Sequence, residues 1–173
     1  MIEETRVKPP VDLGGGFGIS GLCQVTVERR TPGFPEYGTV EHIREKNLII
    51  TPGMNFLASM ISSQAIGANS QMAYMAVGTN ATAATVLQSM TLGEVVRKAF
   101  SVVSVGANSW SAVTTFGGGS DSIVGVTVAE ALVVNAAASG TGIALNRAIL
   151  GATFSLQNSD VAAVQFIIAC GSR

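Results

Sequence analysis

The sequence predicts an all-β protein: an antiparallel, jelly-roll-like β-sandwich with one short α-helix near residues 52–64. Two observations favour this class. After residue 70, six short apolar segments rich in β-branched residues recur, and Gly, Asn and Ser separate them. Only one segment of the chain combines a helix start signal with apolar residues at helical spacing. With 173 residues, the chain is long enough for one domain that buries a sizeable core.

We expect two parts, an extended N-terminal arm at residues 1–22 and a sandwich domain at 23–173. The arm combines a charged start, the pair Pro9-Pro10 and the glycine-rich run LGGGFGISG, a composition that cannot hold a helix. Prolines stiffen an extended chain and glycines give it a flexible joint, so the arm is suited to binding a partner. Its apolar anchors, at spacings that one side of an extended strand can present, are Val11, Leu13, Phe17 and Ile19.

The first predicted strand follows the arm, because apolar and polar residues alternate there, with one face formed by Cys23, Val25 and Val27. The turn-rich segment TPGFPEYG at residues 31–38 then predicts a hairpin to a second strand. Thr51-Pro52 next supplies an N-cap followed by proline at the first helical position, which predicts the start of the helix.

The six segments after the helix are predicted to be strands. They are QMAYMAV, GEVVRKAFSVVSV, WSAVTTF, SIVGVTVAEALVV, IALNRAILGATF and VAAVQFIIAC. Within Val95 to Val105, neither of the two alternating faces is cleanly polar. A strand that is apolar on both sides needs cover on both sides, so we expect one face in the sandwich core and the other in a subunit interface.

Charge is distributed very unevenly along the chain. Of the 21 charged residues, 13 precede residue 48, and the whole chain is only 12% charged with a mean hydropathy of +0.44. A surface so poor in charge is expected to be covered by a membrane or by a partner. No apolar stretch reaches about 18 residues and the N-terminus lacks the apolar core of a signal peptide, which favours a partner over a membrane. We therefore expect a homo-oligomer, preferably a trimer, with a dimer as the alternative.

The sequence predicts no nucleic-acid site, cofactor site, metal site or catalytic site, and we expect the chain not to be an enzyme. Net charge is −1 and the basic residues form no stripe. A single histidine, His42, cannot build a His-rich metal site, and no nucleophile motif accompanies it. The glycine pattern at 16, 18 and 21 resembles a dinucleotide fingerprint but precedes β-branched residues instead of a helix. Cys23 and Cys170 are expected to be two buried thiols in preference to a disulfide.

Isolated charges within the apolar part of the chain are expected to pair, because a buried charge costs several kcal/mol when it has no partner. The predicted structural pairs are Glu94 with Arg97 and Glu130 with Arg147, the latter across adjacent strands. Among the aromatic residues, which stand in turn-like contexts, Trp110 is the candidate anchor of a protein interface or, alternatively, a platform for a sugar.

The order of short motifs from Asn47 to Phe166 resembles that of small virion proteins of tailed bacteriophages. Those proteins carry an "NLIT-x-G" strand end before a short helix, which matches Asn47 to Gly53, and an "AVGTG" strand and turn, which matches Ala76 to Asn80 except that Asn80 replaces glycine. Three further motifs, an "L-x-x-E-x-x-R", an "E-A-G-L-F" and an "L-x-R-A-x-F", have similar segments around Glu94-Arg97, at Glu130-Ala131-Leu132-Val133 without the glycine, and at Leu145-Asn146-Arg147-Ala148.

The resemblance implies a virion structural role. Proteins of this kind include jelly-roll decoration (cement) proteins, which would make the major capsid protein the partner, the capsid surface the location and the host cytoplasm the place of synthesis. The runner-up is a tail or fibre-associated component, either an adaptor or a receptor-binding protein. A third reading, from the residues themselves, is a carbohydrate-binding β-sandwich module with Trp110 at its site.

Overall fold

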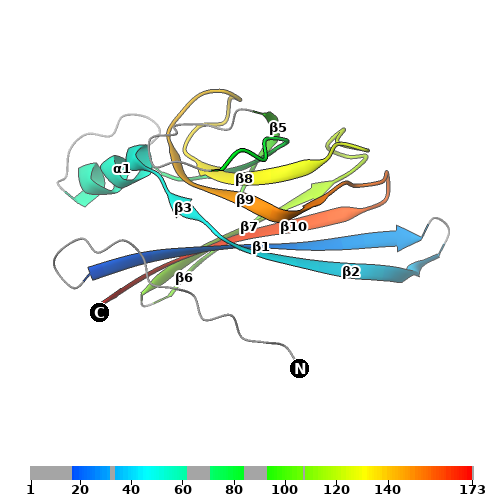
Figure 1. The fold of residues 1–173 in the computed structure, drawn as a ribbon, viewed down its shortest axis with the longest axis horizontal. Helices are drawn as coiled ribbons and strands as arrows, with labels where there is room; N and C mark the ends of the chain where they lie inside the picture. The colour runs from blue at the N-terminus through cyan, green and yellow to red at the C-terminus, as the bar shows by residue number, and fades with distance from the viewer. Residues whose placement is uncertain (1–16, 32–33, 62–70, 84–92, 107, 173) are drawn as a thin grey trace.

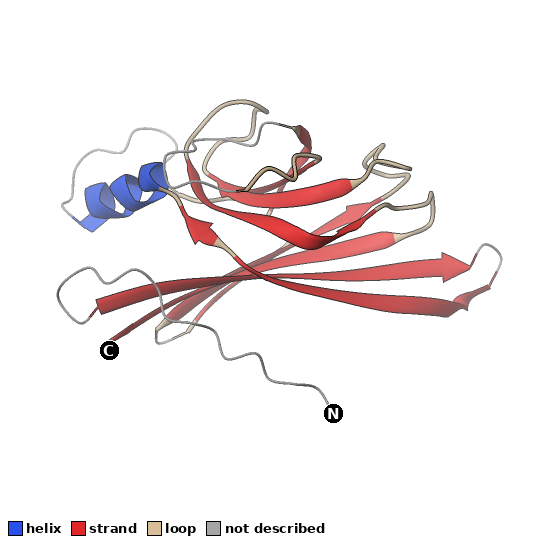
Figure 2. Ribbon diagram, in the orientation of Figure 1, coloured by secondary structure: helices blue, strands red, loops and turns tan. Residues whose placement is uncertain are grey.

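The structure, a computed structural model, describes residues 17–31, 34–61, 71–83, 93–106 and 108–172. These residues form two five-stranded antiparallel sheets that face each other, with one helix at one end (Figures 1 and 2). The predicted class, an all-β sandwich with one short helix, is confirmed.

Each sheet is formed by strands from several parts of the chain. Sheet A has the order β2-β1-β10-β7-β6 and consists of β1 (Phe17–Thr31), β2 (Phe34–Lys46), β6 (Val102–Val105), β7 (Ser109–Gly117) and β10 (Val161–Ser172). Sheet B has the order β3-β9-β8-β4-β5 and consists of β3 (Leu48–Ile49), β4 (Tyr74–Gly78), β5 (Glu94–Ala99), β8 (Val128–Val134) and β9 (Ala144–Phe154).

The core lies between the sheets and is built by two-residue alternation. On β1, the three residues that alternation predicts to be buried are indeed at most 1% exposed, and they face the buried side chains of β10 in register, for example Val25 opposite Val164. Sheet B contributes an apolar layer from β4, β8 and β9. Its buried members include Met75, Val77, Ala131, Val133, Ala148 and Leu150.

The helix α1 (Thr51–Ile61) packs against β9 at one end of the sandwich. It begins at the predicted Thr51-Pro52 pair, and its close approach to β9 requires the glycine that follows. A Cβ atom at Gly53 would lie 2.6 Å from Leu145 Cα, a separation that packed atoms do not tolerate. The predicted helix end near residue 64 lies outside the described residues.

The structure places three segments differently from the sequence prediction. β1 begins at Phe17, so residues 17–22 of the predicted arm are paired with β10, up to Phe17 opposite Ser172. Residues 1–16 lie outside the described part of the chain. The hairpin turn is tighter than predicted: Thr31 is opposite Phe34, and residues 34–38 belong to β2 instead of the turn.

The third difference concerns residues 95–105, whose pattern predicted a single strand. They form the end of one strand and the whole of another, β5 in sheet B and β6 in sheet A. The chain crosses between sheets at Phe100-Ser101: Phe100 N–H donates to Ala73 O at 3.0 Å, and Ser101 N–H donates to Val113 O at 2.8 Å. The mixed polarity of this segment therefore arises from two strands with different environments.

Candidate functional site

The outer face of sheet B carries a buried ion pair at its centre. Arg147 on β9 donates from Nε to Glu130 Oε2 on β8 at 2.6 Å, and both side chains are completely buried. The register places Leu132 opposite Arg147 and Ile149 opposite Glu130, so the two side chains extend diagonally toward each other on one face. The structure thus brings together the Glu130 and Arg147 that the sequence analysis paired.

Space for this pair is made by a glycine in the neighbouring strand β4. Gly78 lies opposite Glu130, and a Cβ atom there would come within 2.5 Å of Glu130 Oε1. The carboxylate also accepts from Asn80 N–H at 3.3 Å, just past the end of β4. The turn that follows β4 therefore covers the pair, and Gly78 allows the carboxylate to lie flat on the sheet.

The second predicted pair lies on the same outer face, at the edge strand β5. Arg97 binds Glu94 through two parallel hydrogen bonds, of 2.9 Å from Nε and 2.6 Å from Nη2, and both side chains are more than 90% buried. The remaining guanidinium nitrogen donates to three backbone carbonyls of the β8–β9 loop, those of Ala136, Ala138 and Thr141. Arg97 thus fastens this loop over the outer face of sheet B.

The arrangement around Glu94 determines its ionisation. Burial opposes the charged form and raises the pKa of Glu94, but the hydrogen bond and charge of Arg97, with hydrogen bonds from Ser139 and the Gly140 backbone, outweigh it. The pKa of Glu94 therefore lies below its ordinary value. The carboxylate is charged in the folded protein and serves to hold Arg97.

The other isolated charges of the apolar part also have partners. Lys98 Nζ donates to Asp121 Oδ2 at 3.0 Å and to Thr115 O at 2.9 Å, which links β5 of sheet B to β7 of sheet A. Asp160, 3% exposed, accepts from the backbone N–H of Arg30 at 3.1 Å and lies 3.4 Å from Arg29. All seven described charges beyond residue 47 are therefore engaged in holding the fold. They are Glu94, Arg97, Lys98, Asp121, Glu130, Arg147 and Asp160.

The outer face of sheet A has the opposite character. No charged residue occurs in its three strands β10, β7 and β6. Because the residues of β10 that face the core alternate with the others, its outward residues are Val161, Ala163, Gln165, Ile167 and Ala169, all partly exposed. Charges on this face are confined to β2 and the hairpin end of β1, and no described element packs over it (Figure 1). The uncharged part of this outer face is therefore three strands, or about 14 Å, wide, and no described element covers it.

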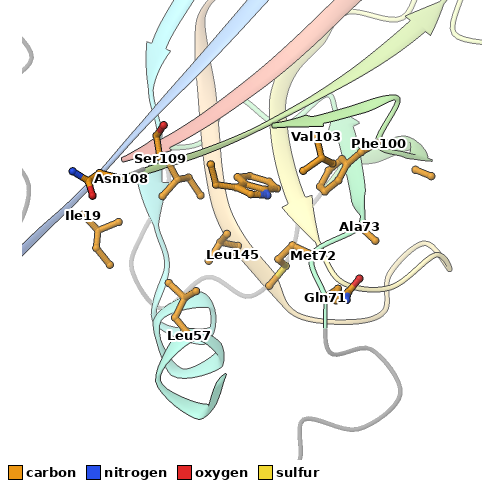
Figure 3. A pocket seen from close by; sticks show the side chains of 13 residues that line it. Ile19, Leu57, Gln71, Met72, Ala73, Phe100, Val103, Asn108, Ser109 and Leu145 are labelled. Carbon is orange, nitrogen blue, oxygen red and sulfur yellow. The ribbon is translucent and has the colours of Figure 1, made fainter. Parts of the chain in front are cut away.

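An apolar pocket opens at the end of the sandwich where β1 begins. Its volume is about 780 Å³, and it is lined by residues from both sheets and from the helix. Figure 3 shows Leu57 of α1, Leu145 of β9, Met72 and Phe100 around the cavity, with Asn108 and Ser109 at one side. The few polar groups of the lining suit an apolar occupant better than a polar one.

Trp110 belongs to this pocket and does not stand on an open surface. It lies on the core-facing side of β7, half-buried, and its ring meets that of Phe100 edge-on with centroids 5.6 Å apart. A sugar platform requires an exposed ring face beside polar groups, so this geometry favours an apolar anchor. The turn-like context predicted for the aromatics is wrong for Phe116, which is fully buried within β7.

The predicted arm anchors separate into two groups. Phe17 and Ile19 belong to β1, and Ile19 lines the pocket. Val11 and Leu13 lie outside the described residues. The sequence analysis did not predict the pocket, because its lining comes from segments that are distant in the chain.

The cysteines cannot join each other. Cys23 is a free, buried thiol, and burial raises its pKa, with the charge of Glu45 adding to the effect. In the register of β1 and β10, the backbone of Cys170 lies opposite Ile19, four residues from Cys23. That is about 13 Å along the strand, beyond the roughly 7 Å between Cα atoms that a disulfide can span.

His42, the single histidine, is exposed on β2, and its nearest side-chain partner is Thr26 at 3.3 Å. Within the described ranges, no cluster of three or more His, Cys, Asp or Glu could hold a metal ion. Nor is any described helix sufficiently long and apolar to span a bilayer. No protein-family model, curated protein or solved structure matches the chain.

Proposed function

We propose that this chain is a bacteriophage virion structural protein of the decoration type, which binds the assembled lattice of the major capsid protein through the outer face of sheet A. The observation that carries the proposal is the contrast between this face, uncharged over three strands, and the charge-bearing but covered face of sheet B. The interior of a protein interface is depleted in charge in the same way.

The size of the face supports a specific contact. At about 3.3 Å along the strand and 4.8 Å across it for each residue, the five strands of sheet A give the whole outer face, including its charged border on β2 and β1, an area of roughly 800 Å². One side of a standard protein interface buries about 800 Å². The backbone of this face is already ordered by the hydrogen bonds of the sheet, so little backbone entropy is lost on binding.

The proposed mechanism is binding alone. A protein that binds the assembled lattice but not the separated subunits stabilises the assembly by mass action. Because a shell offers many equivalent sites, contacts of ordinary strength add up over the particle. The residues proposed for this contact are the outward side chains of β10 and β7, including Ala163, Gln165 and Ile167 on β10 and Val113 on β7.

The test is the copy number of the chain in purified particles of the phage that encodes it, measured by quantitative mass spectrometry relative to the major capsid protein. A decoration protein is expected at a number comparable with that of the capsid subunits. A number comparable with that of tail proteins would instead favour the tail or fibre-associated alternative. Absence from the particle would contradict both.

A carbohydrate-binding role has less support from the site geometry, because Trp110 faces inward and meets Phe100 in an apolar lining. If the chain had this role, the purified protein would bind sugars on a glycan array, and Trp110→Ala would abolish that binding.

A further inference from the structure

The edge strand β6 is the least protected strand of the described chain. It lies at the edge of sheet A with β7 as its one neighbour, and all four of its residues are exposed. Val102, Val103 and Val105 are 59%, 51% and 77% exposed. Proteins usually protect such an edge with lysine, proline or a bulge, because its unpaired backbone groups accept any extended chain. β6 has none of these features, so it is suited to receive an added strand.

The apolar pocket lies directly beside this edge. Val103 of β6 lines it, together with Phe100 before the strand and Asn108 and Ser109 after it (Figure 3). Trp110 of β7 also belongs to the lining. A strand added to β6 would therefore run along the pocket mouth, and its alternate side chains would point into the cavity. Such an arrangement combines backbone hydrogen bonds, which give affinity, with apolar side-chain sites, which give specificity.

One segment of the chain outside the described residues has the required chemistry. Residues 11–13 read Val-Asp-Leu, so in an extended conformation Val11 and Leu13 share one side while Asp12 takes the other. This spacing matches that of Val103 and Val105 on β6. The preceding Pro9-Pro10 favours an extended approach, and the glycines at 14–16 allow the chain to bend away afterwards.

The register of sheet A favours a second copy over the chain's own arm. The described chain begins at Phe17 in β1, and β10 and β7 separate β1 from β6. Three strand spacings amount to about 14 Å, and the four residues from Leu13 to Phe17 reach about 14 Å only when fully extended. The arm would have no length left to turn and run along β6 of its own chain.

We propose that residues 11–13 from the arm of a second copy of this chain pair with the free edge of β6 and place Val11 and Leu13 in the apolar pocket. Repeated around a symmetry axis, this exchange of arms closes into a dimer or a trimer. The added strand would fill the apolar pocket and cover the exposed valines of β6. The proposal goes beyond the virion role and does not depend on it, since it concerns the purified chain alone.

Cysteine trapping in the full chain tests the contact and its source. Leu13→Cys combined with Asn108→Cys, oxidised mildly, is expected to give covalent dimers or larger closed species on a non-reducing gel. The control pairs Thr5→Cys with Asn108→Cys, and each single variant reports the background from the native cysteines. A disulfide within one chain would overturn the proposal, and so would no intermolecular product above the controls.

A second experiment uses charge at the two edges of sheet A. Val105→Glu places a carboxylate on the edge of β6, whereas Val40→Glu places one on β2, the opposite edge strand, at a residue that is also exposed (56%). In analytical ultracentrifugation, Val105→Glu is expected to weaken self-association at least tenfold, and Val40→Glu to leave it unchanged. Equal behaviour of the two variants, or a monomeric parent chain, would overturn the proposal.

Discussion

The outer faces of the two sheets differ in both charge and cover. The face of sheet B carries Glu94, Arg97, Glu130 and Arg147, and the turn after β4 and the β8–β9 loop bury it. The face of sheet A is uncharged over β10, β7 and β6 and has no described element over it. In a protein that stays alone in water, the uncovered face would be expected to carry the charges. The described charges beyond residue 47 thus serve internal structure, and the reversal supports our proposal that the uncharged face makes contact with another protein.

The largest effect is expected when one charge is removed from the covered outer face of sheet B. Arg147→Met leaves the completely buried Glu130 carboxyl group without its guanidinium partner, and we expect a loss of about 3–5 kcal/mol in the free energy of unfolding, measured by urea denaturation. Combining it with Glu130→Leu removes both charges and should recover much of the loss. Losses that simply add would show that the two side chains are energetically independent.

A smaller effect is expected from Arg97, which joins Glu94 to the β8–β9 loop. Arg97→Met removes hydrogen bonds to a carboxylate and to three carbonyls, and we expect a loss of about 2–3 kcal/mol. Hydrogen exchange should rise in the loop around Ala138 before it rises in β10. Arg30→Met is the control, because Arg30 is half-exposed and lies 3.6 Å from Glu28. This variant should lose no more than about 0.5 kcal/mol in the free energy of unfolding. Unchanged exchange in the loop would refute the fastening role of Arg97.

The depressed pKa of Glu94 gives the covered face a pH dependence of defined sign. A carboxyl group whose pKa is lower in the folded state than the ordinary 4.5 stabilises the protein fully above that value. The contribution is lost as pH falls through the folded pKa, below 4.5. Glu94→Gln should therefore flatten the decline in melting temperature on acidification, while the parent chain and the variant decline alike if Glu94 plays no part.

On the inner face of sheet A, one substitution is expected to increase the free energy of unfolding, in contrast to those above. Thr114 is fully buried on β7, and its Oγ1 has no hydrogen-bond partner within the described part of the chain. Thr114→Val replaces the hydroxyl with a methyl group of similar volume, so we expect a gain of about 1 kcal/mol in the free energy of unfolding. A loss would imply that the hydroxyl has a partner, such as an ordered water molecule.

Much of this comparison could be predicted from the sequence, and the rest could not for a physical reason. Two-residue alternation predicts strands and buried faces, as for Cys23, Val25 and Val27, and the cost of burying a lone charge predicts that Glu130 and Arg147 meet. The same alternation does not reveal which sheet a strand joins. Residues 95–105 therefore looked like one strand, although Phe100-Ser101 carries the chain from sheet B to sheet A.

The sequence likewise did not predict that the outer face of sheet B is covered and that of sheet A is not. Arg97 reaches carbonyls about 40 residues away in a loop with no distinctive pattern, and backbone carbonyls are the same in every residue. The pocket is assembled from six separate stretches of the chain, so no local motif marks it. The arm boundary at residue 22 was placed too late, because the glycines of LGGGFGISG hid a strand start at Phe17.

Our proposal that a partner covers the outer face of sheet A can be tested along one row of residues that crosses this face. In the register of the sheet, His42, Thr26, Ala163 and Thr115 lie side by side, from the charged border on β2 to the uncharged centre. Ala163→Lys and His42→Lys thus introduce the same side chain at the centre and at the border. Ala163 is partly exposed and His42 is exposed, so the melting temperature of either variant should stay within a few degrees of the parent value.

The measurement is the binding of each purified variant to phage particles that lack the protein. We expect Ala163→Lys to bind at least tenfold more weakly than the parent chain, because a desolvated, unpaired charge would lie within the contact, and His42→Lys to bind like the parent. Equal binding by Ala163→Lys and the parent chain would show that the partner does not bind the outer face of sheet A.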